Sequence, residues 1–86
     1  MNEPFTAKLA ERFRLRARTD GDRLRAALGA SDRATLGIIA HGLSGTAGTF
    51  GFAEISALAA ELEEAFEGGA PLDAAAQRLL NALNQL

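Results

Sequence analysis

The chain has 86 residues and a formal net charge of −2, a length that allows one small domain and leaves no room for two separate cores. It has no cysteine, which excludes disulfides, thiolate metal sites and a cysteine nucleophile. Alanine and leucine dominate, aromatic residues make up only 6% and β-branched residues are sparse, so the composition predicts an all-α fold. We therefore expect residues 1–86 to form a single helical domain.

Basic residues gather in the first third of the chain, and glutamates gather later, between Glu61 and Glu67. Acidic residues are interleaved with the basic ones and no aromatic ladder accompanies them, which argues against a nucleic-acid partner. The first four residues lack the basic and apolar regions of a signal peptide, and no apolar run approaches the length of a membrane span. These patterns predict a cytoplasmic protein without a membrane partner, whose later glutamates form a solvated helix face.

The first 30 residues are expected to be helical. An apolar stripe runs along them, first at every fourth position and then nearly in phase: Phe5, Leu9, Phe13, Ala17, Leu24 and Leu28. Residues 19–22 contain a glycine between two aspartates, so residues 5–28 form either one helix or two helices with a kink. The continuous phase of the stripe favours one helix, and Gly29 is placed to end it near the C′ position.

A second helix is predicted over residues 32–49. Ser31 is a good N-cap, and Asp32 in the first turn favours the helix dipole. Gly51 can adopt the left-handed conformation that ends many helices. The apolar stripe of this segment has the 3- and 4-residue spacing of a buried helix face: Leu36, Ile39, Ala40, Leu43, Ala47 and Phe50.

Two more amphipathic segments follow. One begins near Phe52 or Ala53 and stops at the Gly-Gly-Ala-Pro run of residues 68–71, and Asp73 can cap the last one. Their stripes are Ile55, Leu58, Ala59, Leu62 and Phe66, and then Ala76, Leu79, Leu80, Leu83 and Leu86. Short loops between amphipathic helices imply antiparallel neighbours, so we predict an up-and-down four-helix bundle, with an extra short N-terminal helix as the alternative.

The only histidine, His41, stands in the second segment and away from its apolar stripe. Five residues neighbour it on the helix surface, and four of them have almost no side chain: Gly37, Ile38, Ser44, Gly45 and Gly48. A glycine inside a helix costs roughly 1 kcal/mol relative to alanine, so a purpose other than stability is expected at these positions. We infer that they let another macromolecule approach the imidazole, whereas Gly42 lies on a different side and permits close helix crossing.

Other kinds of site fit this region poorly. A metal site is not expected, since the chain has no second histidine, no cysteine and no acidic pair at ligand spacing near His41. A catalytic triad would use Ser44, one turn away, but no carboxylate is evidently placed to orient the ring. The glycines that repeat every three residues lack the Gly-x-x-x-x-Gly-Lys-Ser/Thr pattern of a phosphate loop. We therefore expect no metal and no bound cofactor.

Residues 41–51 resemble the signature of histidine-containing phosphotransfer (HPt) domains, roughly His-x-Leu-Lys-Gly-x-Ala-x-x-x-Gly. Here the segment reads His-Gly-Leu-Ser-Gly-Thr-Ala-Gly-Thr-Phe-Gly, and the similarity continues through residues 52–58 to Glu63. One position departs from the family pattern, because Ser44 stands where the family usually has a lysine that helps to neutralise the phosphoryl group. A serine hydroxyl can still donate a hydrogen bond there.

The resemblance implies a phosphoryl carrier of a multistep two-component phosphorelay, with no ATP site and no kinase activity of its own. His41 would accept the phosphoryl group from an aspartate of a receiver domain and pass it to another receiver, and the receiver would supply the Mg²⁺. The docking surface would comprise Gly37, Ile38, Ser44, Gly45 and Gly48. A hybrid histidine kinase is a further candidate partner, and we expect a monomer.

Two alternatives stay open at this point. The substitution at Ser44 motivates a docking module of the same fold, which binds a receiver or a histidine kinase and regulates it without being phosphorylated. The second alternative is the N-terminal phosphoacceptor domain of a larger chemotaxis-type histidine kinase. Arg33, two turns before His41, is a further residue that would approach a phosphate only indirectly.

Overall fold

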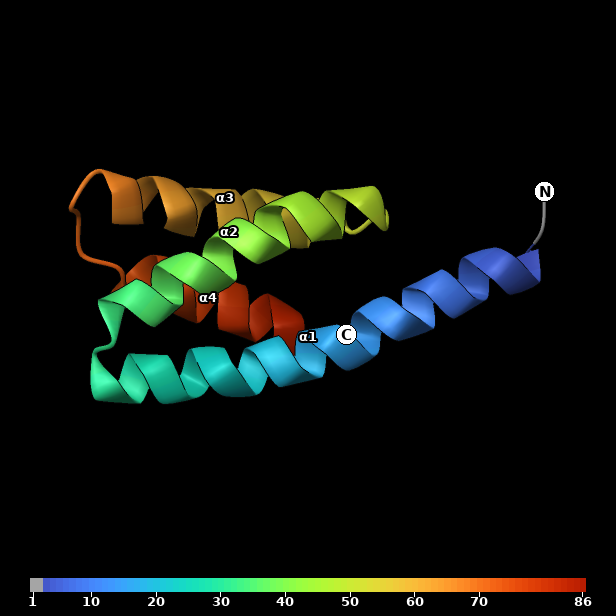
Figure 1. Ribbon diagram of the computed structural model, residues 1–86, viewed down its shortest axis with the longest axis horizontal. Coiled ribbons are helices and arrows are strands. Elements are labelled where there is room, and N and C mark those ends of the chain that lie inside the picture. The colour runs from blue at the N-terminus through green and yellow to red at the C-terminus, as the bar shows by residue number, and fades with distance from the viewer. Residues whose placement is uncertain (1–2) are drawn as a thin grey trace.

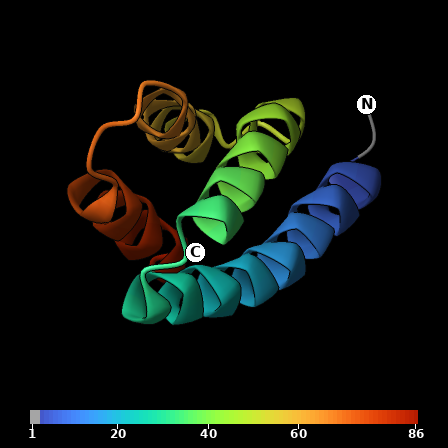
Figure 2. The ribbon, with the colours of Figure 1, turned by 60° about the vertical axis from the view of Figure 1, so that its left-hand side comes forward.

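The computed structural model describes the backbone of residues 3–86 and the side chains from Ala7 onward. These residues form four α-helices: α1 (Glu3–Ala30), α2 (Arg33–Thr49), α3 (Ala53–Glu67) and α4 (Asp73–Asn84). Each helix packs against the next, and α4 returns to α1, so the helices surround a common interior in up-and-down order (Figures 1 and 2). The prediction of an all-α four-helix bundle is confirmed, without an extra N-terminal helix in the described residues.

Helix α1 is continuous through residues 19–22 and reaches beyond the other three helices toward the N-terminus (Figure 1). Phe13, Ala17 and Leu24 of its apolar stripe are all buried, as predicted, so the stripe stays on one face of the helix. The side chain of Phe5 lies outside the described residues. Gly21 faces α4, and a Cβ there would make ordinary contact with Leu80 and Leu83. Continuous burial therefore overrides the local break signal.

Three of the helices end through one residue in the left-handed conformation, at Ser31 (φ 55°), Gly51 (φ 86°) and Gly69 (φ 73°). In each case the next residue's amide donates at 2.8 or 2.9 Å to a carbonyl of the last turn: Asp32 to Ala27, Phe52 to Ala47 and Ala70 to Ala65. This is the Schellman arrangement, which satisfies carbonyls that the helix itself leaves without partners. The predicted role of Gly51 and the stop at residues 68–71 are confirmed.

Two predicted helix boundaries are wrong. Gly29 lies inside α1, and Ser31, expected as an N-cap, is the residue that ends α1. The N-cap of α2 is Asp32, whose Oδ1 accepts a hydrogen bond from the Thr35 amide at 3.1 Å. The reason is packing, since Ala27 is buried and the last turn of α1 continues beyond it.

Helix α4 begins at Asp73, which was predicted to cap it from outside. The N-cap position belongs to Leu72, which is buried and makes no side-chain capping bond. Leu86 belongs to the predicted stripe of α4 but is exposed, because the helix ends at Asn84. The carboxylate of Asp73 still lies in the first turn, where a negative charge is favourable.

The core is formed by one face of each helix, and its largest fully buried side chains are Phe13, Leu24, Leu43, Ile55, Leu62 and Leu79. Phe13 stacks on Phe52 with ring centroids 4.5 Å apart and lies 5.8 Å from Phe50. This aromatic contact packs α1 against the turn between α2 and α3. Helices α2 and α3 also pack against each other.

Candidate functional site

His41 lies on the outer face of α2. The apolar stripe of that helix is buried, including Ala40 before it and Leu43 after it, so the ring is turned to the surface and its side chain is 80% exposed. The expectation that His41 faces away from the core is confirmed. The imidazole is open to a partner.

The ring of His41 contacts a carboxylate that comes from α3. The Nδ1 of His41 lies 2.5 Å from Oε2 of Glu63, whose side chain is only 21% exposed. The other carboxylate oxygen of Glu63, Oε1, lies 3.1 Å from the hydroxyl of Ser44. That hydroxyl also lies 3.0 Å from the His41 carbonyl, and with one proton it donates to one acceptor at a time.

The electrostatics of this pair follow from the hydrogen bond. The bond to Glu63 and the negative charge of Glu63 raise the pKa of His41 above its ordinary value, and the charge of Glu67 adds to the effect. The bond to His41, with a further one from Ser44, lowers the pKa of Glu63. An ionised carboxylate only accepts hydrogen bonds, so Nδ1 of the neutral ring carries the proton and Nε2 carries the free lone pair.

The backbone beneath the site is fixed by a second hydrogen bond between α2 and α3. The Ser56 hydroxyl donates to the Ser44 carbonyl at 2.8 Å. A Cβ at Gly48 would lie 3.3 Å from the Ser56 hydroxyl, so the missing side chain lets α3 come close at this point. Gly48 is exposed as well, and it thus combines a packing role with an open surface.

The other glycines around His41 differ from one another. Gly37 is buried, and a Cβ there would lie 2.8 Å from three ring atoms of Phe66, closer than real Cβ atoms come. The sequence-based explanation for Gly37, room for a partner, is therefore replaced by contact inside the protein. At Gly45 nothing lies within 4 Å of an added Cβ, and the residue is exposed. Gly45 fits the expected open surface.

A shallow hollow lies beside the ring, lined by Gly37, Ile38, His41, Glu63, Phe66 and Glu67. Ile38 is 65% exposed, which is unusual for so large an apolar side chain. Ser44 is half-buried against Glu63. Of the five residues predicted to form the docking surface, Ile38, Gly45 and Gly48 are exposed, Ser44 is partly covered, and Gly37 forms part of the floor.

Arg33 does not extend toward His41. Its guanidinium donates to the carbonyls of Ala65, Phe66 and Ala70, at 2.7 to 3.3 Å, and lies 5.5 Å from the ring centroid of Phe66. A cation is favourable at the C-terminus of a helix, so Arg33 caps α3. The guanidinium is thus engaged at the end of α3, in agreement with the expectation that Arg33 has no direct contact with a phosphate.

Glu63 is the residue that the sequence reasoning missed. It was assigned to a solvated face, and the ring was expected to have no orienting carboxylate. The signal lies in the pairing of α2 with α3 as an antiparallel hairpin centred on Phe52, which is eleven residues from both His41 and Glu63. Contacts of Gly48 with Ser56 and of Gly37 with Phe66 bracket the contact of His41 with Glu63. Counting equal steps outward from the turn would have placed a carboxylate opposite the histidine.

Among the side chains that the structure describes, from Ala7 onward, no group of three or more histidine, cysteine or acidic side chains could hold a metal ion. Within the same part of the chain, no helix is both long and apolar enough to span a membrane.

Comparison with known proteins agrees with the geometry of this site. The model of the Hpt domain family matches residues 8–86, a range that includes the whole contact between α2 and α3. Comparisons with curated proteins and with solved structures give no match. Because the family match extends over almost the entire sequence, the chain belongs to the Hpt domain family.

Proposed function

We propose that this Hpt domain carries a phosphoryl group on His41 in a multistep phosphorelay, accepting it from the aspartate of one receiver domain and passing it to another. Hpt domains act in histidine phosphotransfer, as carriers and not as autonomous kinases. The observation that carries the proposal is the exposed imidazole whose Nδ1 is bound to Glu63. This arrangement leaves Nε2 as the nucleophile.

The proposed reaction is a direct displacement at phosphorus. The lone pair on Nε2 attacks the phosphorus of an aspartyl phosphate, the N–P bond forms, and the P–O bond to the aspartate breaks. The aspartate leaves as a carboxylate, so no proton has to move in this step. The ring becomes positively charged, and the Glu63 carboxylate on the Nδ1 proton stabilises that charge. Transfer to the second receiver is the same reaction in reverse.

The remaining parts of the reaction belong to the partner on this proposal. Mg²⁺ bound by the receiver would offset the charge on the phosphoryl oxygens and hold the group in line with Nε2. The domain contributes the oriented nucleophile and an accessible surface around it. The exposed Ile38 offers an apolar contact, and the bare backbone at Gly45 and Gly48 allows the receiver to come close to the ring.

The test is phosphotransfer from a panel of phosphorylated receiver domains carrying labelled phosphate. Label is expected on the wild type and not on His41→Gln, and it should survive alkali and be lost in acid, as a phosphohistidine is. Ser44→Ala serves as a matched variant, since it removes a contact to Glu63 and keeps the nucleophile. Tight receiver binding without label from any donor would replace the carrier by the non-phosphorylated docking module.

A further inference from the structure

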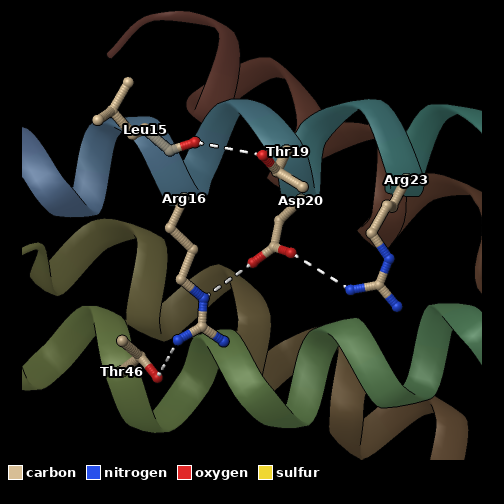
Figure 3. Close-up of polar contacts among 6 residues, drawn as sticks. All are labelled: Leu15, Arg16, Thr19, Asp20, Arg23 and Thr46. Atoms are coloured by element: carbon tan, nitrogen blue, oxygen red, sulfur yellow. Dashed lines mark hydrogen bonds and ion pairs between the residues drawn. The ribbon is translucent and has the colours of Figure 1, made fainter.

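A second polar cluster lies between α1 and α2 (Figure 3). Its centre is Asp20 of α1, which is only 5% exposed. The two carboxylate oxygens of Asp20 accept from Nε of Arg16 at 3.3 Å and from Nη1 of Arg23 at 3.4 Å. Arg16 also reaches across to α2, where its Nη1 donates to the Thr46 hydroxyl at 3.1 Å. Two arginines share one carboxylate, so the cluster keeps a net positive charge.

Arg16 lies close to the surface that surrounds His41. Its Nη2 is 3.2 Å from the position of a Cβ at Gly42, the residue next to His41. A Cβ at Gly42 would therefore be in tight contact with the guanidinium, which places Arg16 beside the backbone of α2 at this point. Around the circumference of α2, the directions of Ile38 and Gly45 lie between those of His41 and Gly42. The Arg16 side chain is 46% exposed, so its guanidinium is held in place and still open to solvent.

The surface around His41 is therefore charged differently on its two sides. On the α3 side lie the carboxylates of Glu63 and Glu67, and on the α1 side lies the guanidinium group of Arg16, beside Gly42. A partner that covers the ring meets both sides at once. Complementary charge in such a position sets the orientation and the rate of encounter more than the affinity.

We propose that Arg16 is a docking residue that binds carboxylates of the receiver domain and turns the acidic part of the receiver toward α1. The inference rests on the proposed function, because it takes a receiver with an aspartyl phosphate as the partner. On the proposed function such a partner would present the aspartate and the carboxylates that hold its Mg²⁺, so acidic side chains would line the face that approaches this domain. The positive charge of the half-exposed guanidinium attracts a carboxylate, whereas Glu63 and Glu67 repel one. Asp20 positions Arg16 for this contact.

The test measures the phosphotransfer rate against receiver concentration at low and high salt. For Arg16→Gln we expect the half-saturating receiver concentration to rise by roughly three- to fivefold at low salt, with the maximal rate unchanged and a weaker salt dependence. Arg25→Gln is the matched control. Arg25 also lies on α1 and has one contact on its own helix, Asp22 at 3.1 Å, and one across to α4, Asn84 at 3.4 Å. This control should leave the half-saturating concentration unchanged.

A purely structural Arg16 would give a different pattern. The melting temperature of Arg16→Gln would fall, while the half-saturating concentration measured well below that temperature would stay at the wild-type value. This result, or equal effects of Arg16→Gln and Arg25→Gln, would overturn the proposal. Arg16→Lys keeps the charge and loses the fork, so partial recovery of the low-salt rate is expected from it.

The inference can fail separately from the proposed function. Binding of an unphosphorylated receiver, measured by titration calorimetry, needs no label on His41. Weaker binding by Arg16→Gln than by Arg25→Gln would support the docking role even if no donor phosphorylated the domain. Equal binding by the two variants, together with normal labelling of His41, would refute the docking role alone.

Discussion

Replacing Gly45 by alanine should stabilise the domain and slow its phosphotransfer. Gly45 lies in α2, and a Cβ there would find no heavy atom within 4 Å. Nothing opposes the higher helix propensity of alanine, so the free energy of unfolding should rise by about 0.5–1 kcal/mol. In a domain of this size that gain corresponds to a melting temperature higher by about 2–8 °C.

The same substitution at Gly37 should act in the opposite direction. Its Cβ would lie 2.8 Å from three atoms of the Phe66 ring, and that ring is covered by Arg33. Relief of such an overlap costs about 1–3 kcal/mol, which exceeds the gain of about 1 kcal/mol in helix propensity. We expect Gly37→Ala to lower the free energy of unfolding by up to about 2 kcal/mol. Two identical changes in one helix should thus have opposite signs.

Urea denaturation measures both effects, and phosphotransfer kinetics at saturating and limiting receiver measure the functional part. Gly29→Ala in α1 is the control, because its Cβ also meets nothing within 4 Å and Gly29 lies on another helix than His41. It should stabilise the domain without slowing transfer. The reasoning fails if Gly45→Ala destabilises the domain, or if it slows transfer no more than Gly29→Ala does.

Three further substitutions test the histidine pair and one helix junction. Glu63→Gln should move the pKa of His41 down toward 6.5 in an NMR titration, and Glu64→Gln should not. The pair of His41 and Glu63 stabilises the fold most between about pH 4.5 and 6.5. Below this window Glu63 gains a proton, above it His41 loses one, and either change removes the contribution of the pair. Glu63→Gln should therefore flatten the curve of stability against pH in this window. Ser31→Gly should raise the free energy of unfolding by about 1 kcal/mol, because it relieves a positive φ. Asp32→Ala should lower it by about 1 kcal/mol through loss of the cap. Urea denaturation measures both junction variants, and no change in either would contradict the reasoning.

The helices could be predicted from the sequence because each has a clear apolar stripe. The phase that Leu24 shares with Phe13 predicted one continuous α1 against the local signal of residues 19–22. The junction after α1 was misplaced by two residues, since propensity favours glycine at the left-handed position and Ser31 occupies it. Backbone hydrogen bonds offset that strain, and a sequence pattern does not reveal them.

The residues of the candidate site also differ in how well the sequence alone predicts their positions. His41 stands out by its neighbours on a single helix, so periodicity alone places it on the surface. Glu63 and Arg16 reach the site from other helices, and their places depend on the register between helices. Glu63 looks like any member of an acidic run until α3 is set against α2. Gly37 likewise looks like open surface until Phe66 covers it.

The carboxylate of Glu63 has two opposite effects on His41. It favours the ring with its proton on Nδ1, and its negative charge disfavours a phosphoryl group on Nε2. The carboxylate holds the proton of the neutral ring on Nδ1, and it stabilises the positive charge that the ring gains as Nε2 attacks phosphorus. Together with Glu67 it also repels a phosphoryl group on Nε2, and Ser44 brings no positive charge to offset this repulsion. On the proposed function, a metal ion held by the receiver would have to offset this repulsion during transfer. Such a histidine is suited to hand its phosphoryl group on, because the charge around it that favours attack also disfavours retention.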